Sequence, residues 1–324
     1  VACGCATMRM MLIATLFFLV SQEASAAAIR VDADYLAGIK DDNPNPLPRG
    51  FSEWERLNFR VPQIPDIPFA PPPRSVRAQA EYEDNEGMMV RWGSFNSLIT
   101  EMTVAITTGD SSAKVYVVVT GSSQQASAAS VLAGAGANMN RVGFITQACS
   151  NSNQCSVWMR DYGPRYIDDD GRPGIIDHVY NRPWRIVDDA YPDVASSVRN
   201  EPNYDIPLVH GGGNFHLFRN RDAYMTRLIV NENTSLSEQQ IIDYYADYQG
   251  LNVTLTDPFP SSYDSTQHID MWMLPLDDTS VLIGQYASNQ GGGVPKQVTD
   301  ATASLMESRG YTVYRTPGWN AGGT

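Results

Sequence analysis

The sequence is short of positive charge. Its 23 lysine and arginine residues are outnumbered by 36 aspartate and glutamate residues, which gives a net charge of −13. Because a nucleic-acid-binding protein presents a basic face to the phosphates, this balance argues against such a partner. The acidic excess would mildly attract a cationic substrate, or it simply keeps the protein soluble.

Long apolar runs are also scarce. The one such run, residues 12–20, lies near the N-terminus behind Arg9, and the small residues Ala24, Ser25 and Ala26 follow it. This arrangement is typical of a secretory signal peptide, and the run is too short to cross a membrane as a helix. We therefore expect residues 1–26 to comprise upstream residues and a signal peptide. The mature protein would be secreted, periplasmic or at the cell surface, with no stable membrane insertion; a retained anchor is the weaker alternative.

Cysteine is rare. Of the 4 cysteines, Cys3 and Cys5 fall within the expected signal region, and none follows Cys155. Cys149 and Cys155 lie in a polar loop. In an exported protein such a pair is a candidate for a disulfide.

Two common cofactor motifs are missing. No GxGxxG follows a strand-like segment, so a dinucleotide site is not expected. Several imidazole and carboxylate groups could in principle bind zinc or iron: His210, His216, His268, Asp161 and Asp270. No HExxH or comparable ligand spacing accompanies them, which makes metal-dependent hydrolysis the weaker alternative.

What the sequence does contain is enough apolar material for a sizeable core, since apolar residues make up 43% of the chain. Prolines crowd residues 27–78, which we expect to form an irregular leader, partly polyproline II, over the domain surface. Folded structure should begin near Glu81, and the domain should occupy residues 79–324.

From there, strands and helices alternate. The expected strands are residues 87–92, 114–120, 141–146, 251–256 and 311–315, and the expected helices are residues 94–107, 122–138, 235–250 and 295–310. The helix over 235–250 has Ser235 and Glu238 at capping-box spacing and Gly250 as a stop. Helix-then-strand units recur, which indicates a repeated β-α unit rather than one continuous sheet.

Three segments gather the residues suited to chemistry: 158–164 (WMRDYGP), 210–216 (HGGGNFH) and 268–272 (HIDMW). In the third, we expect His268 and Asp270 to share one face of a strand, because side chains at positions i and i+2 of a strand point the same way. An imidazole beside a carboxylate suits a general acid/base next to a charge-binding group. Two solvated polar residues at a strand end are the alternative.

The other two segments are informative in different ways. Glycine has no Cβ, so the run at 211–213 permits a ligand to approach the backbone closely, although a plain turn is the alternative. Asp161 precedes Gly163 and Pro164, so it should lie at the end of an element. There it either serves a site or pairs with Arg160.

In this order, the three segments resemble the agmatine deiminase and porphyromonad-type peptidylarginine deiminase family of guanidine-modifying enzymes. The earlier AEYEDNEGMMVRW (residues 80–92) is similar to that family's opening strand. The resemblance spans residues 80–320, and the ordered set is specific although each motif alone is modest. It implies an α/β pentein fold, a propeller of five ββαβ-type units around a central site, C-terminally incomplete in this chain.

The resemblance also implies hydrolysis of a guanidinium carbon, which releases ammonia and leaves a ureido product such as citrulline. Asp161 and Asp270 would hold the planar cation by paired, charge-assisted hydrogen bonds. A cysteine thiolate would attack the central carbon to give a thiouronium intermediate, and His268 would protonate the departing ammonia and then activate water. Trp158 would pack on the substrate, and no metal or organic cofactor is implied.

The implied substrate-binding set has four further positions: Arg182, Gly212, Gly213 and Asn214. Residues 180–185 (YNRPWR) resemble the Asn-Arg-Pro-Arg run that grips a substrate carboxylate in the peptidylarginine branch. Here Trp184 stands in place of the second arginine, and Arg185 follows it. The sequence leaves open whether Arg185 compensates, and therefore whether C-terminal arginine is preferred.

The family's nucleophilic cysteine lies beyond the HxD motif, near the C-terminus, whereas no cysteine follows Cys155 here. The chain also begins with Val1 rather than methionine. We therefore expect a partial reading frame whose nucleophile lies beyond Thr324, and we expect the fragment itself to turn over no substrate.

The leading hypothesis is an exported deiminase that acts on arginine in peptides or proteins, because free agmatine is chiefly an intracellular metabolite. An exported agmatine or free-arginine deiminase is the alternative among enzymes. A pentein-fold binding module without a nucleophile is the alternative of another class.

Overall fold

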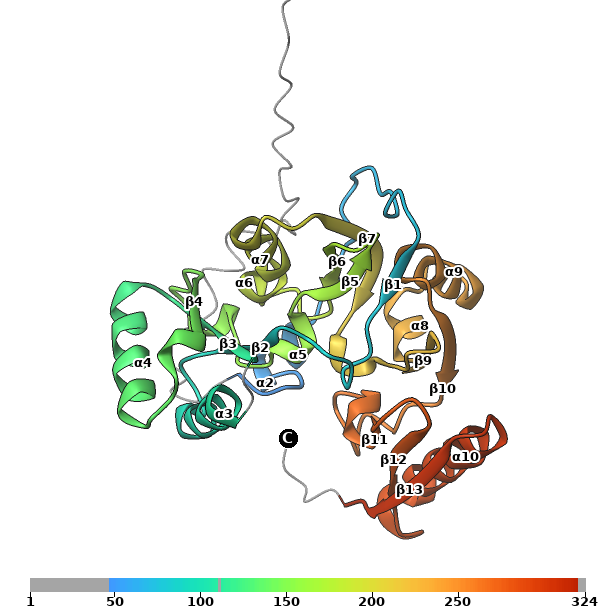
Figure 1. Ribbon diagram of the computed structural model, residues 1–324. Coiled ribbons are helices and arrows are strands. Elements are labelled where there is room, and N and C mark those ends of the chain that lie inside the picture. Colours follow the sequence, from blue (N-terminus) through green and yellow to red (C-terminus); the bar gives the residue numbers. More distant parts are fainter. Residues whose placement is uncertain (1–46, 110–111, 320–324) are drawn as a thin grey trace, which may run out of the picture.

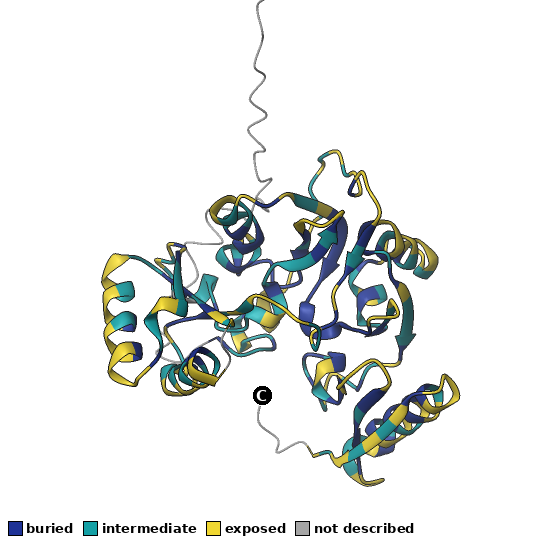
Figure 2. Cartoon of the chain, viewed as in Figure 1, coloured by how far each residue is buried: buried dark blue, intermediate teal, exposed yellow. Residues whose placement is uncertain are grey.

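The computed structural model describes residues 47–109 and 112–319, so the expected signal peptide lies outside the described residues. Within this part, four small sheets surround a common middle, and most helices lie on the outside (Figure 1). Figure 2 shows β6 and β7 largely buried, while β13 and the outer faces of α4 and α10 are exposed.

The first sheet is parallel throughout, in the order β2-β3-β4. Its strands and covering helices alternate along the chain: β2 (Gly87–Arg91), α3 (Asn96–Gly109), β3 (Lys114–Val119), α4 (Ser122–Gly134) and β4 (Val142–Thr146). The central strand β3 is a run of β-branched residues, of which Val117 and Val119 are fully buried. The sequence predicted all five elements close to these bounds.

The other three sheets share one unit, in which an antiparallel strand pair is followed by a helical crossover and a parallel third strand. In the second sheet these elements are β5 (Arg165–Asp169), β6 (Pro173–Tyr180), α6 (Ile186–Asp189), α7 (Tyr191–Arg199) and β7 (Asn203–His210). In the third they are β8 (His216–Leu217), β9 (Asp222–Thr226), α8 (Leu228–Glu232), α9 (Glu238–Gln249) and β10 (Asn252–Thr256). In the fourth they are β11 (Met273–Pro275), β12 (Ser280–Gln285), α10 (Val294–Ser308) and β13 (Thr312–Pro317). The repeated β-α units predicted from the sequence are therefore present.

Helix α9 begins at Glu238, three residues after the predicted start at residue 235, and its N-cap lies two residues later than predicted. Its capping box consists of Ser237 and Gln240, which exchange side-chain-to-backbone hydrogen bonds, instead of Ser235 and Glu238. Its end agrees with the prediction, because Gly250 adopts a left-handed conformation with φ of +68°.

The proline-rich leader contains more regular structure than predicted. Residues 53–58 form α2 (Glu53–Asn58), and β1 (Val76–Ala78) pairs antiparallel with β5 at the edge of the second sheet. Regular structure thus begins before Glu81. The start of α2 is fixed by a capping box between Ser52 and Glu55, an S-x-x-E signature that is visible in the sequence.

Glu55 also fastens α2 to the second sheet. Its carboxylate accepts hydrogen bonds from Nε and Nη2 of Arg185 at 2.8 and 2.9 Å, and both side chains are buried. The neighbouring Trp184 packs edge-on against Trp54, with ring centroids 5.6 Å apart. Burial would raise the pKa of the Glu55 carboxyl, but the Arg185 guanidinium outweighs it and holds that pKa below its usual value.

Replacement of Glu55 by glutamine is therefore expected to lower the free energy of unfolding by about 3 kcal/mol, because it leaves a buried guanidinium without its counter-charge. Urea unfolding measures this change. Glu53→Gln in the same helix is the matched control, since Glu53 is exposed. A loss for Glu55→Gln no larger than that of the control would contradict the role of the pair.

Cys149 and Cys155 form a disulfide, with Cα atoms 6.5 Å apart, in the loop that leads to the central helix α5 (Met159–Tyr162). Both thiols are thereby withdrawn from nucleophilic chemistry.

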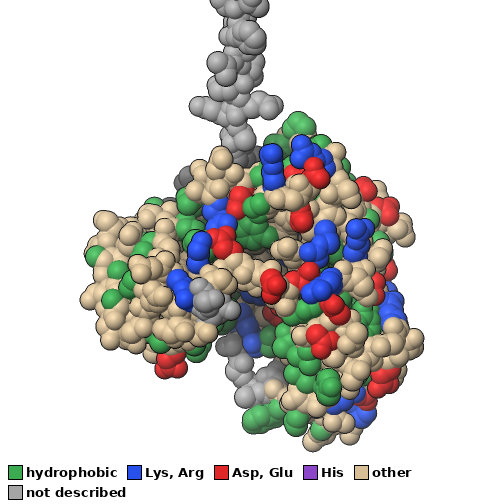
Figure 3. All heavy atoms as spheres, in the orientation of Figure 1, with side chains coloured by type: hydrophobic (Ala, Val, Ile, Leu, Met, Phe, Trp, Pro, Cys, Tyr) green, Lys and Arg blue, Asp and Glu red, His purple; other side chains and the backbone are tan. Residues whose placement is uncertain are grey.

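Across residues 47–109 and 112–319, no helix combines the length and apolar character needed to cross a bilayer. The face seen in Figure 3 carries acidic and basic side chains interspersed rather than one continuous basic stripe.

Candidate active site

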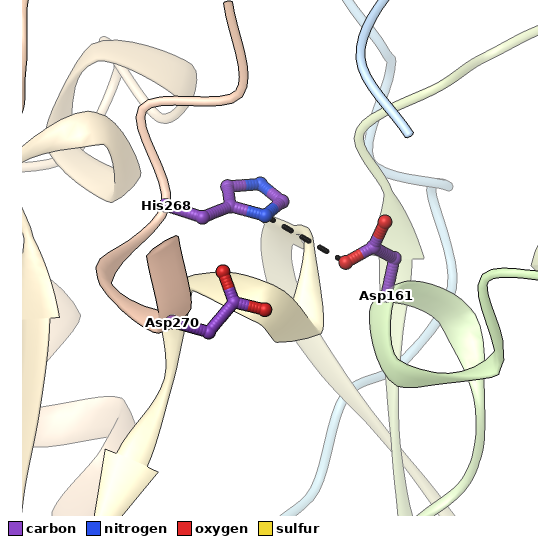
Figure 4. Close-up of side chains that lie close together, drawn as sticks. All are labelled: Asp161, His268 and Asp270. Carbon is purple, nitrogen blue, oxygen red and sulfur yellow. Dashed lines mark ion pairs between the residues drawn. The ribbon is translucent and has the colours of Figure 1, made fainter. Parts of the chain in front are cut away.

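Asp161, His268 and Asp270 are distant in sequence but meet in space (Figure 4). Asp161 lies in α5, and His268 immediately precedes the 3-10 turn η4 (Ile269–Met271) that carries Asp270. One nitrogen or oxygen atom from each of the three side chains lies within 4.8 Å of the others. The structure therefore brings together the three residues that the sequence proposed as catalytic.

The local backbone around His268 differs from the prediction. His268 and Asp270 do not alternate along a strand, because β11 begins only at Met273. The chain instead turns, with Trp272 N donating to the carbonyl of Ile269, and the fully buried Ile269 anchors the turn in the core. The two polar side chains are neighbours because of this turn.

The floor of the site is the 3-10 turn η3 (Gly212–Asn214). A Cβ at Gly213 would lie 2.7 Å from Oδ1 of Asp161 and Oδ2 of Asp270, and closer still to Nδ1 of His268. The backbone N–H of Gly213 donates to Asp161 Oδ1 at 3.2 Å. The close backbone approach predicted for the glycine run is thus present, and Gly213 is the residue that requires it.

Gly212 and Asn214 have positioning roles in this structure. A Cβ at Gly212 would collide with the backbone oxygen of Arg160. Asn214 is fully buried, and its amide exchanges hydrogen bonds of 2.8 and 3.1 Å with the backbone of Thr226. Of the three predicted loop residues, Gly213 borders the acidic group, while the other two hold the loop against α5 and β9.

The two carboxylates disfavour each other's charge. Burial raises the pKa of Asp161, although Arg182, Arg185, the Gly213 N–H and Arg160 act in the opposite direction. Burial and then the negative charge of Asp161 raise the pKa of Asp270 to about 7, even though Asp270 keeps solvent-exposed surface. Near neutral pH, Asp270 therefore exchanges its proton readily, and a bound cation would favour the ionised pair.

His268 is buried, with only 2% of its surface exposed, and its Nδ1 lies 3.6 Å from Asp161 Oδ1. Burial lowers the pKa of His268 well below its usual value, and the positive charges of Arg182, Arg160 and Arg49 add to this effect. The imidazole is therefore neutral near pH 7, and it can accept a proton before it donates one.

Arg185 is not available to a substrate. Besides pairing with Glu55, its Nη2 donates to the carbonyls of Pro48 and Gly50. The sequence left open whether Arg185 compensates for the tryptophan at position 184. These contacts show that the Arg185 guanidinium does not, because they occupy it within the protein. Arg182 is buried, and its guanidinium lies over the ring of Phe51 at 4.1 Å.

Trp158 contacts the leader. Its Nε1 donates to the carbonyl of Leu47 at 2.7 Å, and its ring packs against Phe95 with centroids 6.1 Å apart. The sequence gave no indication of this contact, because no motif marks residues 47–50.

The wider group of potential metal ligands does not converge. His210 bonds to Tyr245, and His216 bonds to Arg160, so neither adds a ligand to the acidic group. The remaining three residues have donor atoms that could hold a divalent cation. The positive charges of Arg160 and Arg182 oppose a dication more strongly than a delocalised monocation.

Residues 77–310 match the family model described as Porphyromonas-type peptidyl-arginine deiminase. The fold is similar to that of C. jejuni agmatine deiminase, with a TM-score of 0.59 and 16% identity over 75% of this chain and 73% of that chain. It is also similar to the agmatine deiminase of Enterococcus faecalis, with a TM-score of 0.60 and 17% identity over 75% and 70% of the two chains. These matches confirm the predicted resemblance and the α/β fold shared with agmatine deiminases.

Proposed function

Because the chain belongs to the Porphyromonas-type peptidyl-arginine deiminase family of guanidine-modifying hydrolases, we propose that it converts arginine in peptides or proteins to citrulline and ammonia. The observation that supports this most strongly is the convergence of Asp161 and Asp270 above Gly213. A planar cation with a fork of donors fits between two such carboxylates, and the absence of a Cβ leaves it room.

The proposed reaction uses His268 first as a base. It accepts the proton of a cysteine thiol as the sulfur attacks the guanidinium carbon, and it returns that proton to the departing amino group, which leaves as ammonia. Water then loses a proton to His268 and attacks the same carbon. The carbon–sulfur bond breaks, and the sulfur takes the proton back from His268. The carbon-bound hydroxyl loses the second proton of the water, which the released ammonia takes up as ammonium, and the neutral ureido product leaves.

The nucleophile is not supplied by the described residues, because Cys149 and Cys155 are joined. We propose that an amidinium compound that carries a chloromethyl group alkylates a cysteine other than Cys149 and Cys155 in the full-length protein. Peptide mapping identifies the labelled position. Excess arginine peptide should protect this cysteine from alkylation. If Asp161→Asn is alkylated as fast as the wild type, the result argues against a clamp formed by Asp161 and Asp270.

The decisive assay measures citrulline and ammonia from an arginine peptide, with agmatine and free arginine alongside. Turnover of agmatine in preference to the peptide would favour the alternative enzyme. Binding of all three without turnover would favour a pentein-fold binding module. The proposal includes export, which the apolar run at residues 12–20 supports, and a five-unit propeller, which the repeated ββαβ units support.

The proposed clamp predicts a pH dependence of substrate binding. Because the pKa of Asp270 is raised to about 7, its ionised form predominates only above that pH, and a guanidinium binds the ionised form. KM should therefore rise about fivefold to tenfold as the pH falls from 8 to 6, since the ionised fraction falls about tenfold per unit below the pKa. Steady-state kinetics across this range measure the change, and a flat KM profile would contradict the role of Asp270.

A further inference from the structure

The N-terminal segment 47–50 lies against both halves of the site, although it precedes the region that matches the family. On one side, the carbonyl of Leu47 accepts a hydrogen bond from Trp158, the N-cap residue of α5, which stands three positions before Asp161. On the other side, Gly50 packs so closely on Ser265 that a Cβ would lie 2.5 Å from its hydroxyl oxygen, and Ser265 stands three positions before His268. The segment thus bridges the two chain regions that carry the site.

The backbone of this segment is held firmly. Nη2 of Arg185 donates to the carbonyl of Pro48 at 2.8 Å and to that of Gly50 at 3.0 Å. Arg185 is itself fixed by its buried pair with Glu55. The residue between the two bonded carbonyls, Arg49, is therefore positioned by its neighbours on both sides.

Arg49 differs from Arg185 and Arg160, which are paired, and from Arg182, which has no ion pair within the described residues but is buried over the ring of Phe51. Arg185 is paired with Glu55, and Arg160 is paired with Glu81 and donates to the carbonyls of Gly212 and Phe215. Arg49 is half-buried, and it has no ion-pair partner within residues 47–109 and 112–319. Burial raises the pKa of Asp270 and lowers that of His268, and other charged groups act next in size. Arg49 nevertheless lies close enough for its positive charge to lower the pKa of both groups.

We propose that Arg49 is a specificity-determining residue that selects among guanidine substrates by the charge at the end remote from the guanidinium. This inference rests on the proposed function. When the guanidinium of a substrate lies between Asp161 and Asp270, the other end of that substrate extends away from the two carboxylates. We infer that this end comes near Arg49. An amine there would be repelled by the guanidinium of Arg49, whereas a carboxylate would be attracted.

Three small substrates separate these cases because they differ mainly in charge. N-acetylarginine has a free carboxylate and no net charge, its amide carries one positive charge, and agmatine carries two. The full-length protein should give the highest kcat/KM with N-acetylarginine and the lowest with agmatine. Arg49→Ala should reduce the ratio between N-acetylarginine and its amide by about tenfold. Arg49→Glu should reverse the order, and Arg49→Lys should restore part of it.

Arg56→Ala is the matched control, because Arg56 lies on the adjoining helix α2 and is exposed. It removes the same charge and should leave all ratios unchanged. Thermal unfolding of each variant checks that the fold is kept. Equal loss on all three substrates in Arg49→Ala, or ratios unchanged within twofold in both Arg49→Ala and Arg49→Glu, would overturn the assignment.

Failure of the proposed function gives a different result, namely no ureido product from any of the three compounds with the unchanged protein. Calorimetric titration then tests the charge selection without turnover. Arginine derivatives with a free carboxylate should bind more tightly than agmatine, and Arg49→Ala should narrow this gap. Equal weakening of all three, or no change in the gap, would reject selection by Arg49.

Discussion

Asp270→Asn is expected to reduce kcat/KM for an arginine substrate by about 30-fold to 5,000-fold. The substitution keeps the shape of the side chain but replaces an anionic acceptor with a neutral amide. Loss of one charge-assisted contact to a buried cation costs about 2–5 kcal/mol, and each 1.36 kcal/mol corresponds to a factor of about ten in rate. The measurement is citrulline formation at limiting substrate, and near-normal formation would refute the clamp.

The same substitution should stabilise the fold at high pH. The pKa of Asp270 is raised from 3.8 to about 7 by burial and by Asp161, so the folded protein holds the proton more tightly than the unfolded chain does. The stability that this proton contributes is fully present below the unfolded pKa and is lost as the pH rises through the folded pKa. Asparagine has no such penalty, so its advantage over the wild type should grow between pH 4 and 7 and then level off.

Thermal unfolding at several pH values tests this second effect. Asp257→Asn is a suitable control, because the Asp257 side chain is 77% exposed. The quantity compared is the stability of Asp270→Asn minus that of the wild type at each pH. If the variant is inactive and this difference is lower at pH 8 than at pH 5, Asp270 serves the fold instead. When substitution of a residue raises stability and removes activity, that residue serves function at a cost in stability.

The regular elements could be predicted because their signals are local. β3 is a run of valines around one tyrosine, and α10 has Pro295 in its first turn and Gly310 just beyond its end. Such patterns depend on residues a few positions apart, and the structure agrees with them. The turn at His268 was not predictable in the same way, since the outcome depends on the burial of Ile269 by distant residues.

The site was only partly predictable for a related reason. Asp161, His268 and Asp270 stand within recognisable motifs, so their convergence could be expected. The roles of Leu47, Arg49 and Glu55 could not, because each acts through a partner more than a hundred positions away or through the fold itself. Proline-rich composition indicates irregular backbone, but it does not indicate what that backbone contacts.

Gly213→Ala is expected to reduce kcat/KM by at least about 100-fold, because a displacement of about 1 Å at a catalytic group can have that effect. The added Cβ would meet both aspartate oxygens at 2.7 Å, well inside ordinary contact distance, and would press on the His268 ring at the same time. Of the three groups, His268 is buried and has little room to move, while Asp161 and Asp270 lie on short turns anchored in the core by the buried Tyr162 and Ile269. The loop itself is pinned by Asn214 to the backbone of Thr226.

The cause of this loss would be steric rather than conformational. Gly213 is not among the residues with positive φ, so alanine can adopt its backbone conformation. Gly134→Ala is the matched control, since a Cβ at Gly134 meets no atom within 4 Å and the residue ends a helix on the outside of the molecule. The control should retain full activity.

Kinetics and thermal unfolding together identify the origin of the effect. If the collision displaces the carboxylates, kcat/KM should fall while the midpoint of unfolding changes by only a few degrees. The pH dependence of KM should also shift, because the pKa of Asp270 depends on its distance from Asp161. Near-normal activity in Gly213→Ala would mean that the loop yields, and the close approach of backbone and carboxylates would then not be a requirement of the site.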